Sequence, residues 1–94
     1  MTTTTQTATA VVGSSVGLHA RPASLLVKAA TKAGRRGVDV TISVAGSEAV
    51  DARSLLSVIA LGARHGDEVT LSAAGDDAPA TLEELVAIVE REED

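Results

Sequence analysis

The sequence predicts an α+β protein, an open-faced β-sandwich in which a four-stranded antiparallel sheet is covered on one face by three helices. Two observations lead to this class: segments of alternating apolar and polar residues take turns with segments of helical periodicity, and the resulting order is βαββαβα. At 94 residues with 45% hydrophobic content, the chain suits a single compact domain. We expect a disordered N-terminal tail over residues 1–6 and the domain over residues 7–94.

The predicted strands rest on a two-residue period and on turn signals. The clearest strand covers residues 38–44, where four β-branched residues alternate with polar ones. The Ala-Gly-Ser sequence at residues 45–47 predicts a tight turn, so that residues 48–52 pair back as a hairpin. By the same period the first strand covers residues 7–12, and the last covers residues 69–73.

The predicted helices have a period near 3.6 residues and recognisable ends. The first covers residues 20–33 and should close at Gly34, and the second covers residues 54–61 and stops before a glycine. The third begins at Asp77, with a proline just inside its first turn. Helical spacing predicts burial of Pro22, Ala23, Leu26, Val27, Ala29, Ala30 and Ala33 on the first helix, and of Leu82, Leu85, Val86 and Val89 on the third.

Composition argues against several classes of partner. Thirteen acidic and eight basic residues give a net charge of −5, which repels nucleic acids and anionic membranes, and the lack of aromatic residues removes stacking on bases. The chain has no cysteine, no apolar run long enough to span a membrane, and no basic and apolar start of a signal peptide. We therefore expect a cytoplasmic protein that binds neither nucleic acid nor membrane.

The chemistry is predicted where the first strand meets the first helix, at Gly-Leu-His-Ala-Arg-Pro-Ala over residues 17–23. Proline is tolerated only in the first turn of a helix, so Pro22 places the helix start at or just before Ala20 and His19 at the N-cap. Histidine is a poor N-cap, and such broken rules concentrate at functional sites. The backbone N–H groups of Ala20 and Arg21, the helix dipole and the Arg21 guanidinium would together stabilise a phosphate on His19.

The same seven residues resemble the active-site signature of HPr, the phosphocarrier of the bacterial phosphoenolpyruvate-dependent phosphotransferase system. The resemblance extends over residues 7–92 and includes Arg-Ser-Leu-Leu at the start of the second helix. It implies that His19 is phosphorylated on Nδ1, that Arg21 assists the transfer, and that Ser54 is a regulatory phosphorylation site. It also implies a carrier that forms a transient phosphohistidine, rather than an enzyme, and that needs no metal or organic cofactor.

The resemblance further implies the partners. Enzyme I would donate the phosphoryl group that it takes from phosphoenolpyruvate, IIA components of sugar permeases would accept it, and an HPr kinase/phosphorylase is a further possible partner at Ser54. We expect the carrier to be a monomer.

The alternative is a regulatory docking module with the same fold, controlled through Ser54 and making little use of His19. The second histidine, His65, lies in a polar turn without ligand spacing to other residues, and we expect it to be solvated.

The helical wheel suggests a docking surface beside His19. Leu25 falls outside the buried face of the first helix, and the second helix is apolar nearly all round, so that some of its residues must face water or a partner. If the two helices lie side by side, their apolar side chains form one patch. The residues predicted to dock partners are Ser24, Leu25, Lys28, Leu55, Leu56 and Ile59.

Overall fold

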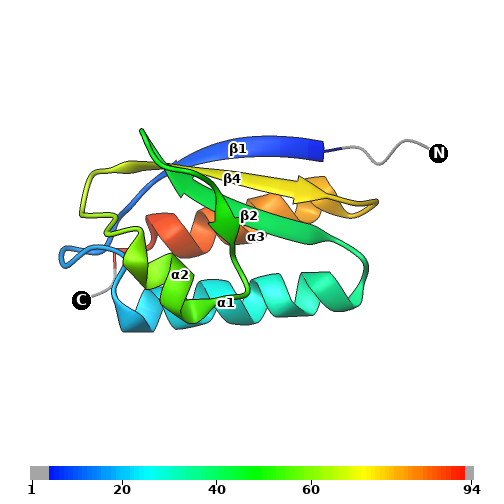
Figure 1. Cartoon of the computed structure of the whole chain (residues 1–94), viewed down its shortest axis with the longest axis horizontal. Coiled ribbons are helices and arrows are strands. Elements are labelled where there is room, and N and C mark those ends of the chain that lie inside the picture. Colours follow the sequence, from blue (N-terminus) through cyan, green and yellow to red (C-terminus); the bar gives the residue numbers. More distant parts are fainter. Residues whose placement is uncertain (1–4, 93–94) are drawn as a thin grey trace.

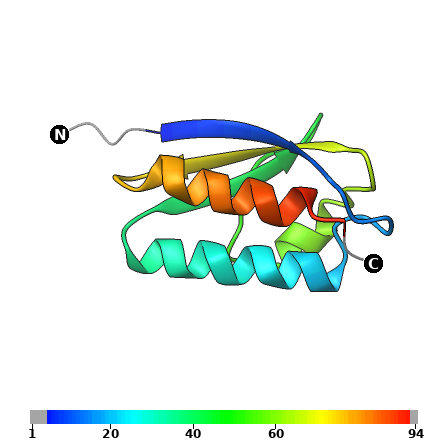
Figure 2. The same cartoon turned by 180° about the vertical axis from the view of Figure 1, so that it is seen from behind.

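The order of elements along the chain agrees with the predicted βαββαβα. The computed structural model describes residues 5–92, which form one four-stranded antiparallel sheet in the order β1-β4-β2-β3 (Figure 1). Three helices cover one face of this sheet, and Figure 2 shows the same layers from behind. The elements are β1 (Thr5–Val11), α1 (Ala20–Arg35), β2 (Asp39–Val44), β3 (Val50–Asp51), α2 (Leu55–Ala60), β4 (Glu68–Ala74) and α3 (Ala78–Glu90). The predicted fold class is therefore confirmed.

The start of β1 differs from the prediction. Thr5 and Gln6, which we assigned to a disordered tail, pair with Ala74 and Ala73 of β4. The threonine-rich composition suggested a tail, but β4 is long enough to offer these two residues ladder partners, and this pairing decides their structure. The rest of the predicted tail, residues 1–4, lies outside the described residues.

The hairpin after β2 is also different, because β3 is much shorter than the predicted strand over residues 48–52. Only Val50 and Asp51 pair with β2. The backbone N–H and the hydroxyl of Ser47 both donate to the Val44 carbonyl, at 3.1 Å each, and this local turn uses the group that a longer ladder would need. The predicted tight turn is present at residues 45–47, but residues 48 and 49 do not pair with β2, so the loop between β2 and β3 covers residues 45–49.

Helix α1 continues past Gly34, where we expected it to close. The residue that turns the chain is Gly37, whose φ of 83° is a left-handed conformation that glycine adopts without steric cost. Its N–H donates to the Gly34 carbonyl at 3.1 Å, and the following Val38 N–H donates to the Ala33 carbonyl at 2.9 Å. Gly34 instead serves packing, since a Cβ atom there would lie 3.3 Å from an Arg53 guanidinium nitrogen.

The core lies between the sheet and the helices, and its hydrophobic side chains are all aliphatic. Alternate residues of the central strands β4 and β2 point into it, and α1 and α3 contribute the stripes that the helical wheel predicted. Two residues predicted to be buried, Val27 and Val86, are only half-buried, because each lies at the edge of its helix's buried stripe. The largest fully buried aliphatic side chains are Val12, Leu26, Val38, Ile42, Val58, Val69, Leu71, Leu85 and Val89.

Because leucine truncation in a dense core leaves a cavity, Leu71→Ala should destabilise the protein by about 2–5 kcal/mol. Leu71 is fully buried in the central strand β4. The matched control is Leu56→Ala, since the Leu56 side chain is 82% exposed on α2 and should lose less than about 0.5 kcal/mol. Urea unfolding followed by circular dichroism measures both. Equal losses in the two variants would contradict this core.

Candidate functional site

His19 occupies the N-cap of α1, as predicted from the position of Pro22. Its backbone is extended, with φ −83° and ψ −171°, and the helix begins at the next residue. The His19 carbonyl accepts the first helical hydrogen bond, from Ala23 N–H at 2.9 Å. Within residues 5–92, the His19 side chain finds no capping hydrogen bond. The imidazole therefore stands at the positive end of a 16-residue helix without using a ring nitrogen to stabilise that end.

The two nitrogens of the His19 ring have different surroundings. Among the described residues, Nε2 of His19 and Oγ of Ser14 are the buried side-chain polar atoms that lack a hydrogen-bond partner. Nδ1 does not belong to this buried group. Since Nε2 is buried, Nδ1 is the ring nitrogen that is more open to an approaching group.

The first turn of α1 can bind an anion next to this ring. N–H groups in the first turn have no intrahelical acceptor, and the helix dipole favours negative charge there. Ala20 and Arg21 supply these N–H groups, because the third residue of the helix is Pro22, which has none. The sequence of this turn contains no Asp or Glu that would compete with a phosphate. Arg21 is exposed and adds the positive charge of its guanidinium to this end of the helix.

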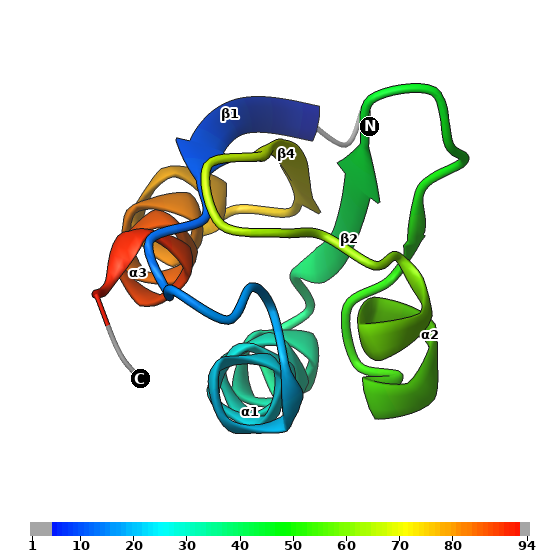
Figure 3. The same cartoon turned by 90° about the vertical axis from the view of Figure 1, so that its left-hand side faces the viewer.

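The loop before His19 is held by a second loop, residues 63–67, that sequence reasoning did not connect to the site. Leu18 N–H donates to the Ala63 carbonyl at 2.9 Å, and Gly66 N–H donates to the Val12 carbonyl at 2.9 Å. Figure 3 views the molecule from the end at which these two loops lie together. The backbone that presents His19 is therefore fixed by contacts between segments about fifty residues apart in the sequence.

His65, which we expected to be only solvated, takes part in this loop contact. Its Nδ1 lies 3.2 Å from the Ser14 carbonyl oxygen, and because a carbonyl can only accept, Nδ1 carries the proton. The rest of the residue is exposed, in agreement with its polar turn. No local sequence signal connects positions 14 and 65, so this contact follows only from the tertiary structure.

Residues 5–92 contain no cluster of three or more His, Cys, Asp or Glu side chains suited to a metal ion, and none of their helices is long and apolar enough to cross a membrane.

Ser54 is the N-cap of α2, and its hydroxyl accepts a hydrogen bond from Ser57 N–H at 3.3 Å. The preceding Arg53 pairs with Asp51 through its guanidinium, at 3.1 Å from Nε to Oδ1 and 3.0 Å from Nη2 to Oδ2. These hydrogen bonds lower the pKa of the Asp51 carboxyl and raise the pKa of Arg53. Ser54 thus has a structural role as a cap, on a surface that also carries an ordered ion pair.

The residues predicted to dock partners lie on two sides of α1. Helix α2 packs on one side of α1 and exposes Leu55, Leu56 and Ile59, of which Leu56 is the most exposed. Leu25 is half-buried and lies on the other side of α1, where it lines a groove against α3. Figure 3 shows α1 between these two helices. The single patch that we expected therefore separates: Ser24 and Lys28 belong to the outer surface of α1, and Leu25 does not meet the apolar residues of α2.

One exposed apolar residue near the site was not predicted to dock. Val16, in the loop that leads to His19, is 64% exposed. Val16 stands between a serine and a glycine in a turn. Turn residues follow no periodic pattern from which a buried or an exposed side chain can be predicted. Val16 lies three residues before His19 in the same loop, so it adds exposed apolar area close in sequence to the imidazole.

A family model described as "PTS HPr component phosphorylation site" matches residues 6–91. The chain belongs to the HPr family. HPr proteins are the phosphocarriers of the phosphotransferase system, and the match includes both the His19 loop and the Ser54 helix cap. None of the curated protein sequences compared with this HPr-family chain matches it.

Solved structures agree with the family assignment. The chain is similar to the phosphocarrier protein HPr from Bacillus anthracis, with 33% identity, coverage of 90% of this chain and 96% of that one, and a TM-score of 0.79. HPr from Thermoanaerobacter tengcongensis is also 33% identical, covers 90% of this chain and 91% of its own, and gives a TM-score of 0.79. Crh, a catabolite-repression protein of Bacillus subtilis described as a domain-swapped dimer, is 39% identical, with coverage of 81% and 83% and a TM-score of 0.67.

Gly17→Ala should destabilise the site loop strongly, because Gly17 has a φ of 82° and a Cβ atom there would lie 2.6 Å from the Ala63 carbonyl oxygen. The matched control is Gly46→Ala, which has the same φ of 82° but no described heavy atom within 4 Å of the added carbon. Left-handed backbone alone costs about 1–2 kcal/mol, so only Gly17→Ala should lose about 3 kcal/mol or more. Thermal unfolding by circular dichroism compares them. Similar losses would mean that the two loops are not in close contact.

Proposed function

We propose that this protein accepts a phosphoryl group from phospho-Enzyme I on Nδ1 of His19 and passes it to IIA components of sugar permeases, acting in the cytoplasm as a monomer. The observation that carries the proposal is the His19 N-cap: the side chain is not used for capping, Nε2 is buried, and the ring stands at the positive end of α1. A structural N-cap would instead use a side-chain oxygen to accept from the helix N–H groups. Membership of a phosphocarrier family supports the same chemistry.

In the transfer step, the lone pair of neutral His19 Nδ1 attacks the phosphorus atom. The Nδ1–P bond forms while the bond between phosphorus and the donor atom breaks, and its electron pair leaves with the donor. The ring proton remains on Nε2. The N–H groups of Ala20 and Arg21 and the Arg21 guanidinium stabilise the charge on the phosphoryl oxygens. Passing the group to an acceptor reverses these steps.

Partner docking is proposed to use the surface around the phosphorylated ring. Leu55, Leu56 and Ile59 on α2 supply exposed apolar area, which a partner can cover, and Ser24 and Lys28 supply a polar edge on α1. Leu25 extends this surface on the side toward α3. The separation of Leu25 from α2 means that a partner must cover the outer face of α1 to reach both.

Ser54 is proposed as a regulatory site that acts on this docking surface. A phosphate there would lie at the N-cap of α2, between the ion-paired Arg53 and the exposed Leu55 and Leu56. The helix end tolerates negative charge, so the fold would persist, whereas the apolar contact with Enzyme I would be weakened. An HPr kinase/phosphorylase is the partner that this modification requires.

A second candidate function is a regulatory docking module that is controlled through Ser54 and does not depend on His19. The observation in its favour is the 39% identity with Crh, which is described as a catabolite-repression protein. The two candidates differ in whether His19 takes up phosphate. The intact His19, Arg21 and Pro22 of the site favour the relay, because a docking module has no need of them.

His19→Ala should abolish phosphorylation by Enzyme I and phosphoenolpyruvate, while unfolding stability falls by only about 0.5 kcal/mol, since no capping hydrogen bond is lost. Intact-mass measurement detects the added phosphoryl group, which should be labile to acid and stable to alkali. The control is His65→Ala, which keeps the proposed nucleophile and should still be phosphorylated. Acid-labile phosphate on His19→Ala would refute the relay, and an unphosphorylated wild-type protein would favour the docking module.

Ser54→Asp should lower kcat/KM for phosphorylation by Enzyme I about tenfold, while Ser54→Ala stays near wild type. Stability should change in the opposite sense: aspartate can still accept from Ser57 N–H, but alanine cannot and should lose about 1 kcal/mol. Because the two variants rank differently by stability and by transfer, a loss of transfer in Ser54→Asp is not a folding effect. Wild-type transfer by a folded Ser54→Asp would remove the switch and leave Ser54 as a cap.

A further inference from the structure

Basic residues in this acidic protein are concentrated on one helix. The chain has eight Lys and Arg residues against thirteen Asp and Glu, yet the segment that forms α1 contains four basic residues and no acidic one. All four are exposed, and at about 100° per residue they share a sector of about 60° on the outer face of the helix. They are Arg21, Lys28, Lys32 and Arg35. This stripe continues about two turns beyond Lys28, the last residue of α1 assigned to Enzyme I docking.

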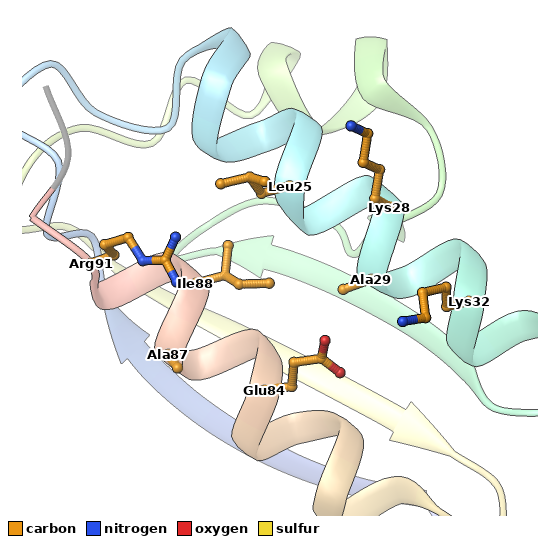
Figure 4. A pocket seen from close by; sticks show the side chains of 8 residues that line it. All are labelled: Leu25, Lys28, Ala29, Lys32, Glu84, Ala87, Ile88 and Arg91. Carbon is orange, nitrogen blue, oxygen red and sulfur yellow. The ribbon is translucent and has the colours of Figure 1, made fainter.

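A groove of about 370 Å³ runs beside this stripe, between α1 and α3 (Figure 4). Its apolar part consists of Leu25 and Ala29 from α1 and of Ala87 and Ile88 from α3. Leu25 and Ile88 reach into the groove from opposite helices, while the two alanines leave space beside them. This arrangement accepts an aliphatic side chain from a third helix packed into the groove, in the way that helix ridges pack into grooves.

The charge on the rim of the groove determines which charge a docked helix should carry. Three basic side chains, Lys28, Lys32 and Arg91, line the groove with a single acidic one, Glu84. In a protein with a net charge of −5, this local positive excess is the reverse of the overall charge. Complementary potentials determine which partners approach a surface and how they are oriented. The rim therefore favours carboxylates on both sides of an inserted apolar residue.

We propose that the α1–α3 groove docks an acidic amphipathic helix of a protein partner, on the side of α1 that faces away from α2. The partner's leucine or isoleucine side chains fill the space above Ala29 and Ala87, and its Glu or Asp side chains pair with Lys28 and Lys32. Neither His19 nor Ser54 is among the residues that line the groove. The groove therefore does not include the proposed nucleophile or the proposed regulatory serine, although it shares Leu25 and Lys28 with the docking surface proposed above.

The test uses the full-length protein, isotopically labelled for NMR, and a helical peptide about four turns long with leucines on one face and glutamates elsewhere. The peptide should shift the amide signals of residues 25–32 and 84–91. We expect a dissociation constant of roughly 0.1–1 mM that rises with salt concentration. Two further peptides, one with lysine for glutamate and one with glutamine for leucine, should each bind about tenfold more weakly.

A matched pair of variants locates the binding site. Ala87→Glu adds bulk and negative charge inside the groove and should weaken peptide binding about tenfold. Ala80→Glu makes the same change at another exposed position of α3 outside the groove, and should alter binding less than about twofold. If Ala87→Glu does not fold, Lys32→Glu on the opposite rim replaces it, with the same expected loss.

Several results would overturn the proposal. Amide shifts confined to α2 or to the His19 end would place the peptide elsewhere. Equal effects of Ala87→Glu and Ala80→Glu, or equal binding of the lysine peptide, would show that the groove does not select an acidic helix. Sedimentation equilibrium of the protein alone provides the remaining test: a dimer that Ala87→Glu dissociates would assign the groove to a second copy of this chain instead.

Discussion

The geometry of the site depends on the close approach of Gly17 to the backbone of Ala63. The two segments are joined by the hydrogen bond from Leu18 N–H to the Ala63 carbonyl, and a side chain at position 17 would collide with that carbonyl. This contact holds the loop in place immediately before α1, whose starting position is restricted by Pro22. At the start of that helix Ala20 and Arg21 are exposed, and Nε2 of the His19 ring is buried. A site made of few residues is thus supported by a backbone contact that involves none of them.

Features of the fold that depend on neighbouring residues could be predicted from the sequence. Alternating residues in β2 and the apolar stripes of α1 and α3 predicted these elements correctly, because an element that buries one face repeats its apolar residues at a fixed spacing along the sequence. The pairing of Thr5 and Gln6 could not be predicted in this way, since it depends on how far β4 extends. Gly34 was misleading for the same reason: a glycine can end a helix or admit a neighbouring side chain, and only the position of Arg53 distinguishes these roles.

The candidate site also has some features that local sequence predicts and others that depend on the tertiary structure. Pro22 was sufficient to place His19 at the N-cap, because proline restricts where a helix can start. The hydrogen bond between His65 and the Ser14 carbonyl spans fifty-one positions and leaves no local pattern. The helical wheel placed Leu25 outside the buried face but gave no information about which neighbouring helix stands there. The answer, α3 rather than α2, required the arrangement of all three helices.

The aliphatic core has a consequence for how this protein can be observed. With no phenylalanine, tyrosine or tryptophan anywhere in the sequence, the chain has no aromatic chromophore and almost no near-ultraviolet absorbance or intrinsic fluorescence. Its core methyl groups, clustered around Leu26, Ile42 and Leu71, experience no ring-current shifts from phenylalanine, tyrosine or tryptophan and should give crowded NMR signals. The lack of intrinsic fluorescence is useful in mixtures. When this protein meets a partner that contains tryptophan, every change in emission reports on the partner alone.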